Sequence, residues 1–150
     1  MKIISITRSL FLLAFICLAQ SVSAQRNPVE WSGTSEKSAD GTYEMSVTGT
    51  IESGWYVYSQ KLESDMGPVP TSLELEGGKG IGEVKESGNR KEGMDKAFDM
   101  NVVKYLDNVT FSQKVKVPQG SKDVTYTVSY MTCNGEMCLP PKSVDVTISL

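Results

Sequence analysis

The sequence contains no histidine, and this absence excludes several kinds of site at once. A Ser-His-Asp triad, a zinc site with His ligands and haem ligation by His all need an imidazole. Cysteine is scarce as well, with three residues in 150. No apolar run approaches the roughly 20 residues that a membrane-spanning helix needs. Any chemistry must therefore use carboxylates, hydroxyls, amines and a few thiols.

The first 24 residues have the features of a secretory signal peptide. Lys2 and Arg8 give a positive start, a short apolar segment covers residues 10–19, and Val22-Ser23-Ala24 is a small-residue cleavage signal. The apolar segment is too short to remain as a membrane anchor. We therefore expect residues 1–24 to be removed during export.

Cleavage after Ala24 would leave a single exported domain over residues 25–150 with two of the three cysteines. It would remove Cys17, and bulky Ile16 disfavours the alternative of a lipid-anchored Cys17, because lipoprotein processing needs a small side chain there. Two basic residues and no acidic residue would be lost, so the net charge changes from −3 to −5. We expect an acidic, monomeric domain that does not bind nucleic acid.

The rest of the chain alternates apolar and polar residues with the period of two that is typical of half-buried strands. The clearest such segments are residues 42–51, 73–75, 109–117, 124–130 and 144–150. Turn signals separate them, and no amphipathic helix longer than a turn or two is visible. This pattern predicts an all-β fold, an antiparallel β-sandwich, with a barrel as the alternative.

Two segments depart from that pattern. Trp55–Tyr58 has no polar face, so it is either covered on both sides or contributes aromatic rings to a site. Glu76–Glu92 is rich in Gly, Lys and Glu, and we expect it to be the least structured part. Its glycines at 77–82 predict a plain turn rather than a phosphate-binding loop, because no Gly-Lys-Ser/Thr step follows.

Cys133 and Cys138 lie between two predicted strands, within Tyr130–Pro141. A structural disulfide is the common interpretation in an exported protein. Two considerations favour a redox-active one. Cross-linking so short a loop removes little entropy from the unfolded chain, and short-range disulfides on exposed turns are often labile.

The neighbouring residues also suit exchange with a protein partner. Asn134-Gly135 allows a tight reversal, and Pro140-Pro141 stiffens the exit. With no histidine, a thiolate would depend on carboxylates, tyrosines or lysines, and Glu136 is the nearest carboxylate in sequence. Three residues form a predicted apolar collar for docking: Met131, Met137 and Leu139.

The chain resembles a known family in several short motifs. Tyr-x-x-Cys and Cys-x-Pro-Pro surround the cysteine pair, and three segments precede it: Gly54–Tyr58, Gly67–Thr71 and Tyr105–Phe111. This family is the amino-terminal periplasmic domain of the thiol:disulfide interchange protein DsbD, or disulfide bond corrector family. The resemblance covers residues 28–150. It implies an immunoglobulin-like fold and a periplasmic location.

The resemblance also implies a role as a protein-disulfide reductase component without cofactor or metal. Electrons would come from a thioredoxin-like or membrane thiol reductase and pass to oxidised periplasmic thiol proteins, as in cytochrome c maturation. Cys138 would form the mixed disulfides and Cys133 would resolve them. Phe98, seven residues before Tyr105, would belong to a cap loop over Asp95–Met100.

Tyr56 and Tyr58 would match the aromatic residues that flank the family's site, next to Met137 of the collar. The chain differs from the family pattern in three respects. The cysteine spacing is one residue shorter, and Lys96-Ala97 replaces acidic residues before the cap phenylalanine, which counts against an acid-base role for the cap. Nothing follows Leu150, so we expect an electron donor in trans.

Other interpretations of the same residues stay open at this point. Phe98 would otherwise be a core aromatic, and Tyr56 and Tyr58 would be ordinary strand packing. Methionine and cysteine sulfurs would suit Cu(I), which gives an exported copper-binding module as one alternative. A passive β-sandwich interaction domain with a structural disulfide is another.

Overall fold

The computed structural model describes residues 26–62 and 66–150, so the predicted signal peptide at 1–24 lies outside the described residues. The described chain forms strands and no helix, and hence no helix that could cross a membrane. The strands are β1 (Val29–Lys37), β2 (Tyr43–Ile51), β3 (Tyr56–Tyr58), β4 (Ser72–Glu76), β5 (Lys79–Asp95), β6 (Met100–Lys116), β7 (Asp123–Tyr130), β8 (Thr132–Cys133) and β9 (Lys142–Ser149).

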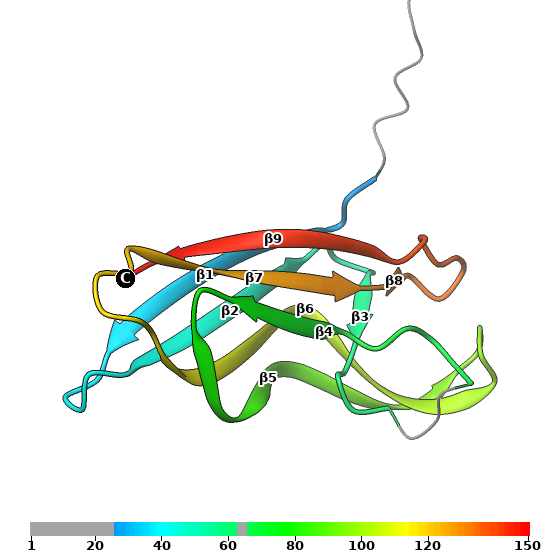
Figure 1. The fold of residues 1–150 in the computed structure, drawn as a ribbon. Helices are drawn as coiled ribbons and strands as arrows, with labels where there is room; N and C mark the ends of the chain where they lie inside the picture. Colours follow the sequence, from blue (N-terminus) through cyan, green and yellow to red (C-terminus); the bar gives the residue numbers. More distant parts are fainter. Residues whose placement is uncertain (1–25, 63–65) are drawn as a thin grey trace, which may run out of the picture.

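The strands form two antiparallel sheets that pack as a sandwich (Figure 1). The larger sheet has the order β1-β2-β6-β3-β8, with β5 also paired to β6, and the smaller sheet has the order β4-β7-β9. The fold is all-β and immunoglobulin-like, which confirms the sandwich prediction. Because the strands form two separate sheets, the barrel alternative is wrong.

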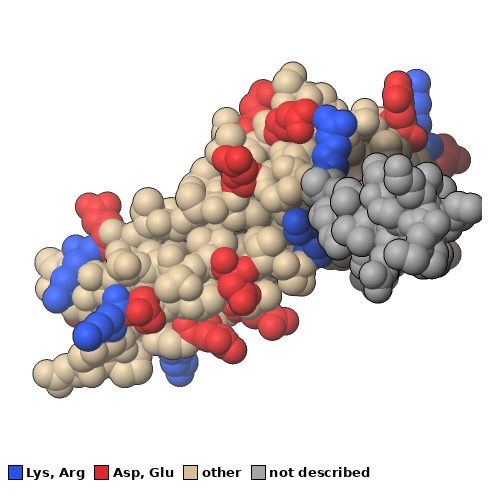
Figure 2. Space-filling view, turned by 90° about the horizontal axis from the view of Figure 1, so that it is seen from above, with Lys and Arg blue, Asp and Glu red and all other residues tan. Residues whose placement is uncertain are grey.

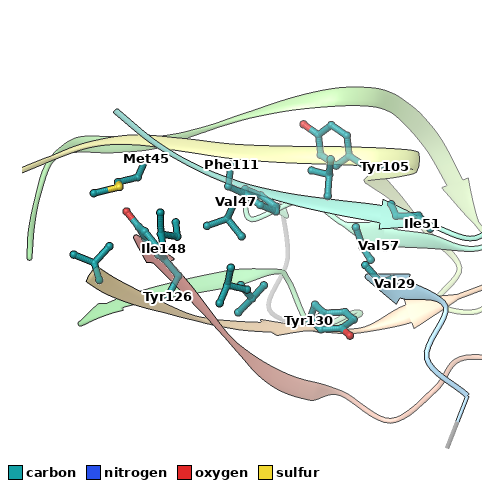
Figure 3. Close-up of a cluster of buried hydrophobic side chains, with 14 of the residues drawn as sticks. Val29, Met45, Val47, Ile51, Val57, Tyr105, Phe111, Tyr126, Tyr130 and Ile148 are labelled. Carbon is teal, nitrogen blue, oxygen red and sulfur yellow. The ribbon is translucent and has the colours of Figure 1, made fainter. Parts of the chain in front are cut away.

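The main core lies between the two sheets and follows the predicted alternation. Met45, Val47 and Ile51 of β2 are buried, whereas Glu44 and Thr50 of the same strand are exposed. Figure 3 shows how side chains from both sheets, such as Phe111 and Tyr126, point into the same space. Full burial of each large apolar side chain stabilises the fold by about 1.5–3 kcal/mol.

The prediction for Glu76–Glu92 is wrong, because most of this segment belongs to β5, a strand of 17 residues. β5 pairs along almost the whole of β6, which starts at Met100 rather than near residue 109. The long hydrogen-bond ladder on β6 outweighs the low strand propensity of Gly, Lys and Glu. As an exposed edge, β5 also benefits from charges that disfavour pairing with another chain.

A register shift between Gly88 and Asn89 explains one of the β5 glycines. Gly88 has a φ of 137°, and a Cβ there would collide with the backbone carbonyl oxygen of Asn108. The turn predicted for the glycines at 77–82 is only partly correct, because Gly80 and Gly82 lie inside β5.

Strand β3 separates two apolar clusters, because its successive side chains point to opposite faces of the larger sheet. Val57 belongs to the main core, whereas Tyr56 and Tyr58 belong to a second cluster on the outer face. All three residues are buried. Both alternatives for Trp55–Tyr58 therefore hold together: the strand is covered on both sides, and one side contributes its rings to a separate cluster.

The charged side chains on the face shown in Figure 2 are scattered among uncharged ones. Acidic and basic groups are interspersed, and the described residues of that face form no continuous area of Lys and Arg. The prediction that the domain does not bind nucleic acid thus continues to rest on its net negative charge.

Candidate functional site

Cys133 and Cys138 are joined by a disulfide across a tight hairpin. The side-chain oxygen of Asn134 accepts hydrogen bonds from the amides of Glu136, at 3.0 Å, and Met137, at 2.9 Å. Gly135 has a left-handed φ of 88°, which an L side chain rarely adopts. These residues reverse the chain so that Cys138 lies opposite Cys133, as the Asn-Gly pair predicts.

The two cysteines differ sharply in exposure. Cys133 is 0% exposed, because it lies in β8 and pairs with Tyr56 of β3 on the outer face of the larger sheet. Cys138 is half-buried. The description of the disulfide as lying on an exposed turn is therefore wrong for Cys133, whose short strand β8 was not predicted.

Cys133 belongs to the second apolar cluster, which is distinct from the main core and which we call the outer cluster. Its buried members are Tyr56, Tyr58, Val102 and Cys133. Partly buried residues complete it: Leu62, Phe98, Met100, Leu106, Met131 and Cys138. The pair, Phe98 and both tyrosines are thus brought together, as the resemblance implied.

A hydrogen-bond chain runs from the disulfide into this cluster. The Tyr58 hydroxyl lies 3.2 Å from the Cys133 sulfur and 3.1 Å from Oδ2 of Asp95. The Tyr56 hydroxyl donates to the same Oδ2 at 3.1 Å. Since a tyrosine hydroxyl carries a single hydrogen, Tyr58 can donate a hydrogen bond to either Asp95 or Cys133, one at a time.

Asp95 is a site residue that sequence reasoning missed. It is 1% exposed, and its Oδ1 accepts the Ala97 amide at 3.0 Å. The Lys104 ammonium lies 3.4 Å from Oδ2 and 4.0 Å from the centroid of the Tyr56 ring. Burial alone would raise the pKa of Asp95, but the Ala97 amide, the Tyr56 hydroxyl and Lys104 outweigh it and hold this pKa below its usual range.

Lys96-Ala97 stands where some members of the family carry acidic residues, which counted against an acid-base role for the cap, yet a buried acid, Asp95, lies three residues before Phe98. The one clue to Asp95 in the sequence was its place as the first residue of the predicted cap loop. In the structure β5 ends at this residue. Glu136, the nearest carboxylate in sequence, is exposed. The carboxylate of the site therefore comes from β5, a strand distant in sequence from the cysteines.

Both tyrosine hydroxyls at the site have a raised pKa. Burial, followed by the neighbouring Tyr56 and Asp95, raises the pKa of Tyr58 well above its usual value. Burial, followed by the charge of Asp95, also raises the pKa of Tyr56. Both residues are therefore neutral hydrogen-bond donors at physiological pH.

Phe98 lies in the turn between β5 and β6, and its ring contacts Tyr58 edge to face at 6.2 Å between centroids. Phe98 is half-buried against the outer cluster rather than part of the main core. Met137 is 55% exposed beside Cys138, while Met131 packs on the outer cluster. Leu139 packs on the main core, so the predicted collar is only partly formed.

Within residues 26–62 and 66–150, no group of three or more Cys, Asp or Glu residues could hold a metal ion. Fold and site together define an immunoglobulin-like domain with a half-buried disulfide. The disulfide belongs to a cluster with two buried tyrosines, and Phe98 from the turn between β5 and β6 packs on the same cluster.

The chain belongs to the family of the thiol:disulfide interchange protein DsbD, N-terminal, whose model matches residues 29–150. It is therefore a thiol-disulfide interchange domain. No curated protein sequence matches the chain significantly.

Two solved structures have a similar fold. The DsbD N-terminal domain of Neisseria meningitidis, in its reduced form, has a TM-score of 0.56 at 16% identity, covering 87% of this chain and 94% of that one. The N-terminal periplasmic domain of ScsB from Proteus mirabilis has a TM-score of 0.55 at 14% identity, covering 77% of this chain and 43% of that one.

Proposed function

We propose that this domain relays electrons in the periplasm by thiol-disulfide exchange through Cys133 and Cys138. It acts as a monomer after removal of residues 1–24. A thioredoxin-like or membrane thiol reductase reduces the pair, and oxidised periplasmic thiol proteins receive the electrons. The main support is the contrast between half-buried Cys138 and fully buried Cys133, whose sulfur lies 3.2 Å from the Tyr58 hydroxyl.

The contrast in exposure supports different roles for the two sulfurs. In the reduced domain, the Cys138 thiolate attacks one sulfur of the acceptor disulfide, and the other acceptor sulfur leaves with the electron pair of the broken bond. The Cys133 thiolate then attacks the Cys138 sulfur, and the second acceptor sulfur leaves. The acceptor gains two electrons, and the domain returns to its disulfide form.

Tyr58 supports the second step because its hydroxyl is placed to stabilise charge on Cys133. A hydrogen bond to a charged group is stronger than one between neutral groups. The hydroxyl lies in a buried cluster, where competition from water is small. Cys133 thus has a local source of thiolate stabilisation without a histidine.

Phe98 acts as a cap that limits access of small thiols to the disulfide. Its ring lies against Tyr58 and the outer cluster, on a short turn between two strands. A docking partner displaces this turn to reach Cys138. Exposed Met137 contributes a flexible apolar contact to the docked partner.

Trapping with single cysteine variants tests the roles. Cys133→Ala, mixed with an oxidised thioredoxin-like acceptor, should accumulate a stable mixed disulfide through Cys138. Cys138→Ala is the matched control and should trap far less. Trapping through Cys133 in the Cys138→Ala variant alone would reverse the assignment.

The reduction potential of the wild-type pair in a glutathione buffer tests the relay itself. A relay requires a reducible bond that exchanges with a thioredoxin-like donor. A potential below about −300 mV would mark the disulfide as structural and favour a passive interaction domain. Stoichiometric Cu(I) binding by the reduced protein, lost in the double Cys→Ala variant, would favour the copper-binding alternative.

A further inference from the structure

Lys104 lies in the site although the exchange steps themselves do not call for a lysine. It is on β6, in register with Tyr58 of β3 on one side and with Lys91 of β5 on the other. Its side chain is 20% exposed, against 1% for Asp95. A lysine side chain that is mostly buried needs a partner that compensates its charge.

Two groups near the disulfide act as that partner, the Asp95 carboxylate and the Tyr56 ring. The ammonium lies 3.4 Å from Oδ2 of Asp95 and 4.0 Å from the centre of the Tyr56 ring. Both contacts are attractive, the first between opposite charges and the second between a cation and the negative face of the ring. The position of Lys104 is therefore linked to the two groups that surround Tyr58.

Groups from several elements contact Asp95, and Lys104 is the positively charged group among them. Strand β3 contributes the hydroxyls of Tyr56 and Tyr58, the following turn contributes the Ala97 amide, and β6 contributes Lys104. Beyond Tyr58 lies the Cys133 sulfur of β8. Lys91, the register neighbour on β5, is exposed, and in the described part of the chain the salt bridge to Asp95 is made by Lys104.

We propose that Lys104 is a positioning residue for thiol exchange, which keeps Asp95 charged and aligned so that Tyr58 donates its hydrogen to Asp95. The oxygen of Tyr58 is then free to accept the thiol hydrogen of Cys133. This inference rests on the proposed function, because it assigns a role within the resolving step. It makes Lys104 part of the route by which the buried thiol loses its proton.

The resolving step balances as follows. The Cys133 hydrogen passes to the Tyr58 oxygen while the Tyr58 hydrogen passes to Oδ2 of Asp95. The Cys133 electron pair forms the bond to Cys138, and the bond between Cys138 and the partner sulfur breaks. The partner sulfur leaves with that electron pair and takes a proton from water, and Asp95 later releases its proton to water.

The charged Lys104 ammonium is one of the groups that extend this route to lower pH, together with the Ala97 amide and the Tyr56 hydroxyl. The route needs ionised Asp95, so the resolving rate should fall at acidic pH as the carboxylate is protonated. An opposite charge at this distance lowers a carboxyl pKa by about 1–3 units. Removing the Lys104 charge should move the acidic limb of the pH profile to higher pH.

The test uses the reduced full-length mature domain and the aromatic disulfide 5,5′-dithiobis(2-nitrobenzoate). Cys138 forms a mixed disulfide with thionitrobenzoate, and attack by Cys133 releases the second thionitrobenzoate, which is followed by absorbance in a stopped-flow instrument. Rates are measured from acidic to neutral pH for wild type, Lys104→Met and Lys104→Arg. Lys91→Met is the matched control, since it removes an exposed lysine from the adjacent strand.

The acidic limb of the rate profile should lie at the same pH for wild type, Lys104→Arg and Lys91→Met, and at a measurably higher pH for Lys104→Met. An unshifted limb in folded Lys104→Met would overturn the inference, as would the same shift in Lys104→Arg. Lys104→Gln replaces Lys104→Met if the latter does not fold, and the NMR titration of the Asp95 carboxyl in the oxidised protein should show the same shift. Failure of wild type to exchange with any thioredoxin-like protein would instead reject the proposed function, while the release assay would still test Lys104.

Discussion

Tyr58 has one hydroxyl hydrogen and two neighbours that can accept it, the carboxylate of Asp95 and the sulfur of Cys133. Its surroundings keep the hydroxyl neutral, because burial, followed by the neighbouring Tyr56 and Asp95, raises the pKa of Tyr58. The residue can therefore respond to charge on the sulfur without becoming charged itself. This makes Tyr58 the most informative single side chain at the site.

Tyr58→Phe should slow resolution of a mixed disulfide by about 10-fold or more, because a hydrogen bond to a charged group contributes about 1.5–3 kcal/mol. The measurement is the stopped-flow exchange rate with a thioredoxin-like partner. Tyr126→Phe is the control, since it removes a hydroxyl from a buried tyrosine of the main core that contacts Gln113 instead. Equal slowing in both variants would show that the Tyr58 hydroxyl has no specific role.

Two of the residues around Tyr58 illustrate the limits of sequence reasoning. Phe98 could be predicted, because its spacing from Tyr105 matches a family pattern. Asp95 and Lys104 could not, since neither stands in a motif and their contact depends on the pairing of two long strands. Asp95 and Lys104 are nine residues apart on consecutive paired strands. Because β5 carries no alternation of apolar and polar residues, the period of two did not predict this pairing.

Among the elements, the turn between β5 and β6 carries Phe98, the proposed cap residue. It places Phe98 against Tyr58 through Asp95, whose Oδ1 accepts the Ala97 amide of the same turn. The carboxylate thus connects the conformation of the turn to the tyrosine beside the sulfur. We therefore expect that displacement of the turn would alter the hydrogen bonding at the disulfide through Asp95.

Phe98→Ala should increase the rate at which glutathione reduces the oxidised domain, on the order of 10-fold, because the aromatic contact with Tyr58 is lost and Cys138 becomes more accessible. The rate is followed by quantifying free thiols. Lys96→Ala is the matched control, because Lys96 lies in the same turn but is exposed. An unchanged rate in Phe98→Ala would mean that the ring does not limit access.

Strand β5 shows why one element escaped prediction. Its Gly, Lys and Glu residues have low strand propensity and no sustained apolar face. β5 forms a strand because β6 is a long strand with which it can pair. This pairing cannot be read from the sequence of either segment alone. β2, β7 and β9 were predictable because each carries its own alternation of core and surface residues.

At the scale of the whole molecule, buried tyrosines link stability to alkaline pH. Burial, followed by the charge of Glu44, raises the pKa of Tyr126 to about 12. Burial likewise raises the pKa values of Tyr105 and Tyr130. Because these folded-state values exceed the unfolded value of about 10, the neutral forms favour folding.

The free energy of unfolding should therefore lose the tyrosine contribution as the pH rises from about 10 to about 12, a contribution that is fully present below about pH 10. Urea unfolding at pH 8 and pH 11 measures the change. Tyr126→Phe should lose less stability over this interval than wild type. Parallel losses in the two proteins would show that Tyr126 does not contribute to the pH dependence.

The alternation of β3 has a consequence for protein engineering. Val57 faces the space between the sheets, whereas Tyr56 and Tyr58 face away from it. The outer cluster, which holds the proposed exchange site, therefore lies on the outer face of the larger sheet. Both layers draw on β3 and β6, but among the described residues no side chain belongs to both clusters. An engineer can therefore vary the outer layer to change partner choice or reactivity while leaving the main hydrophobic core intact as a scaffold.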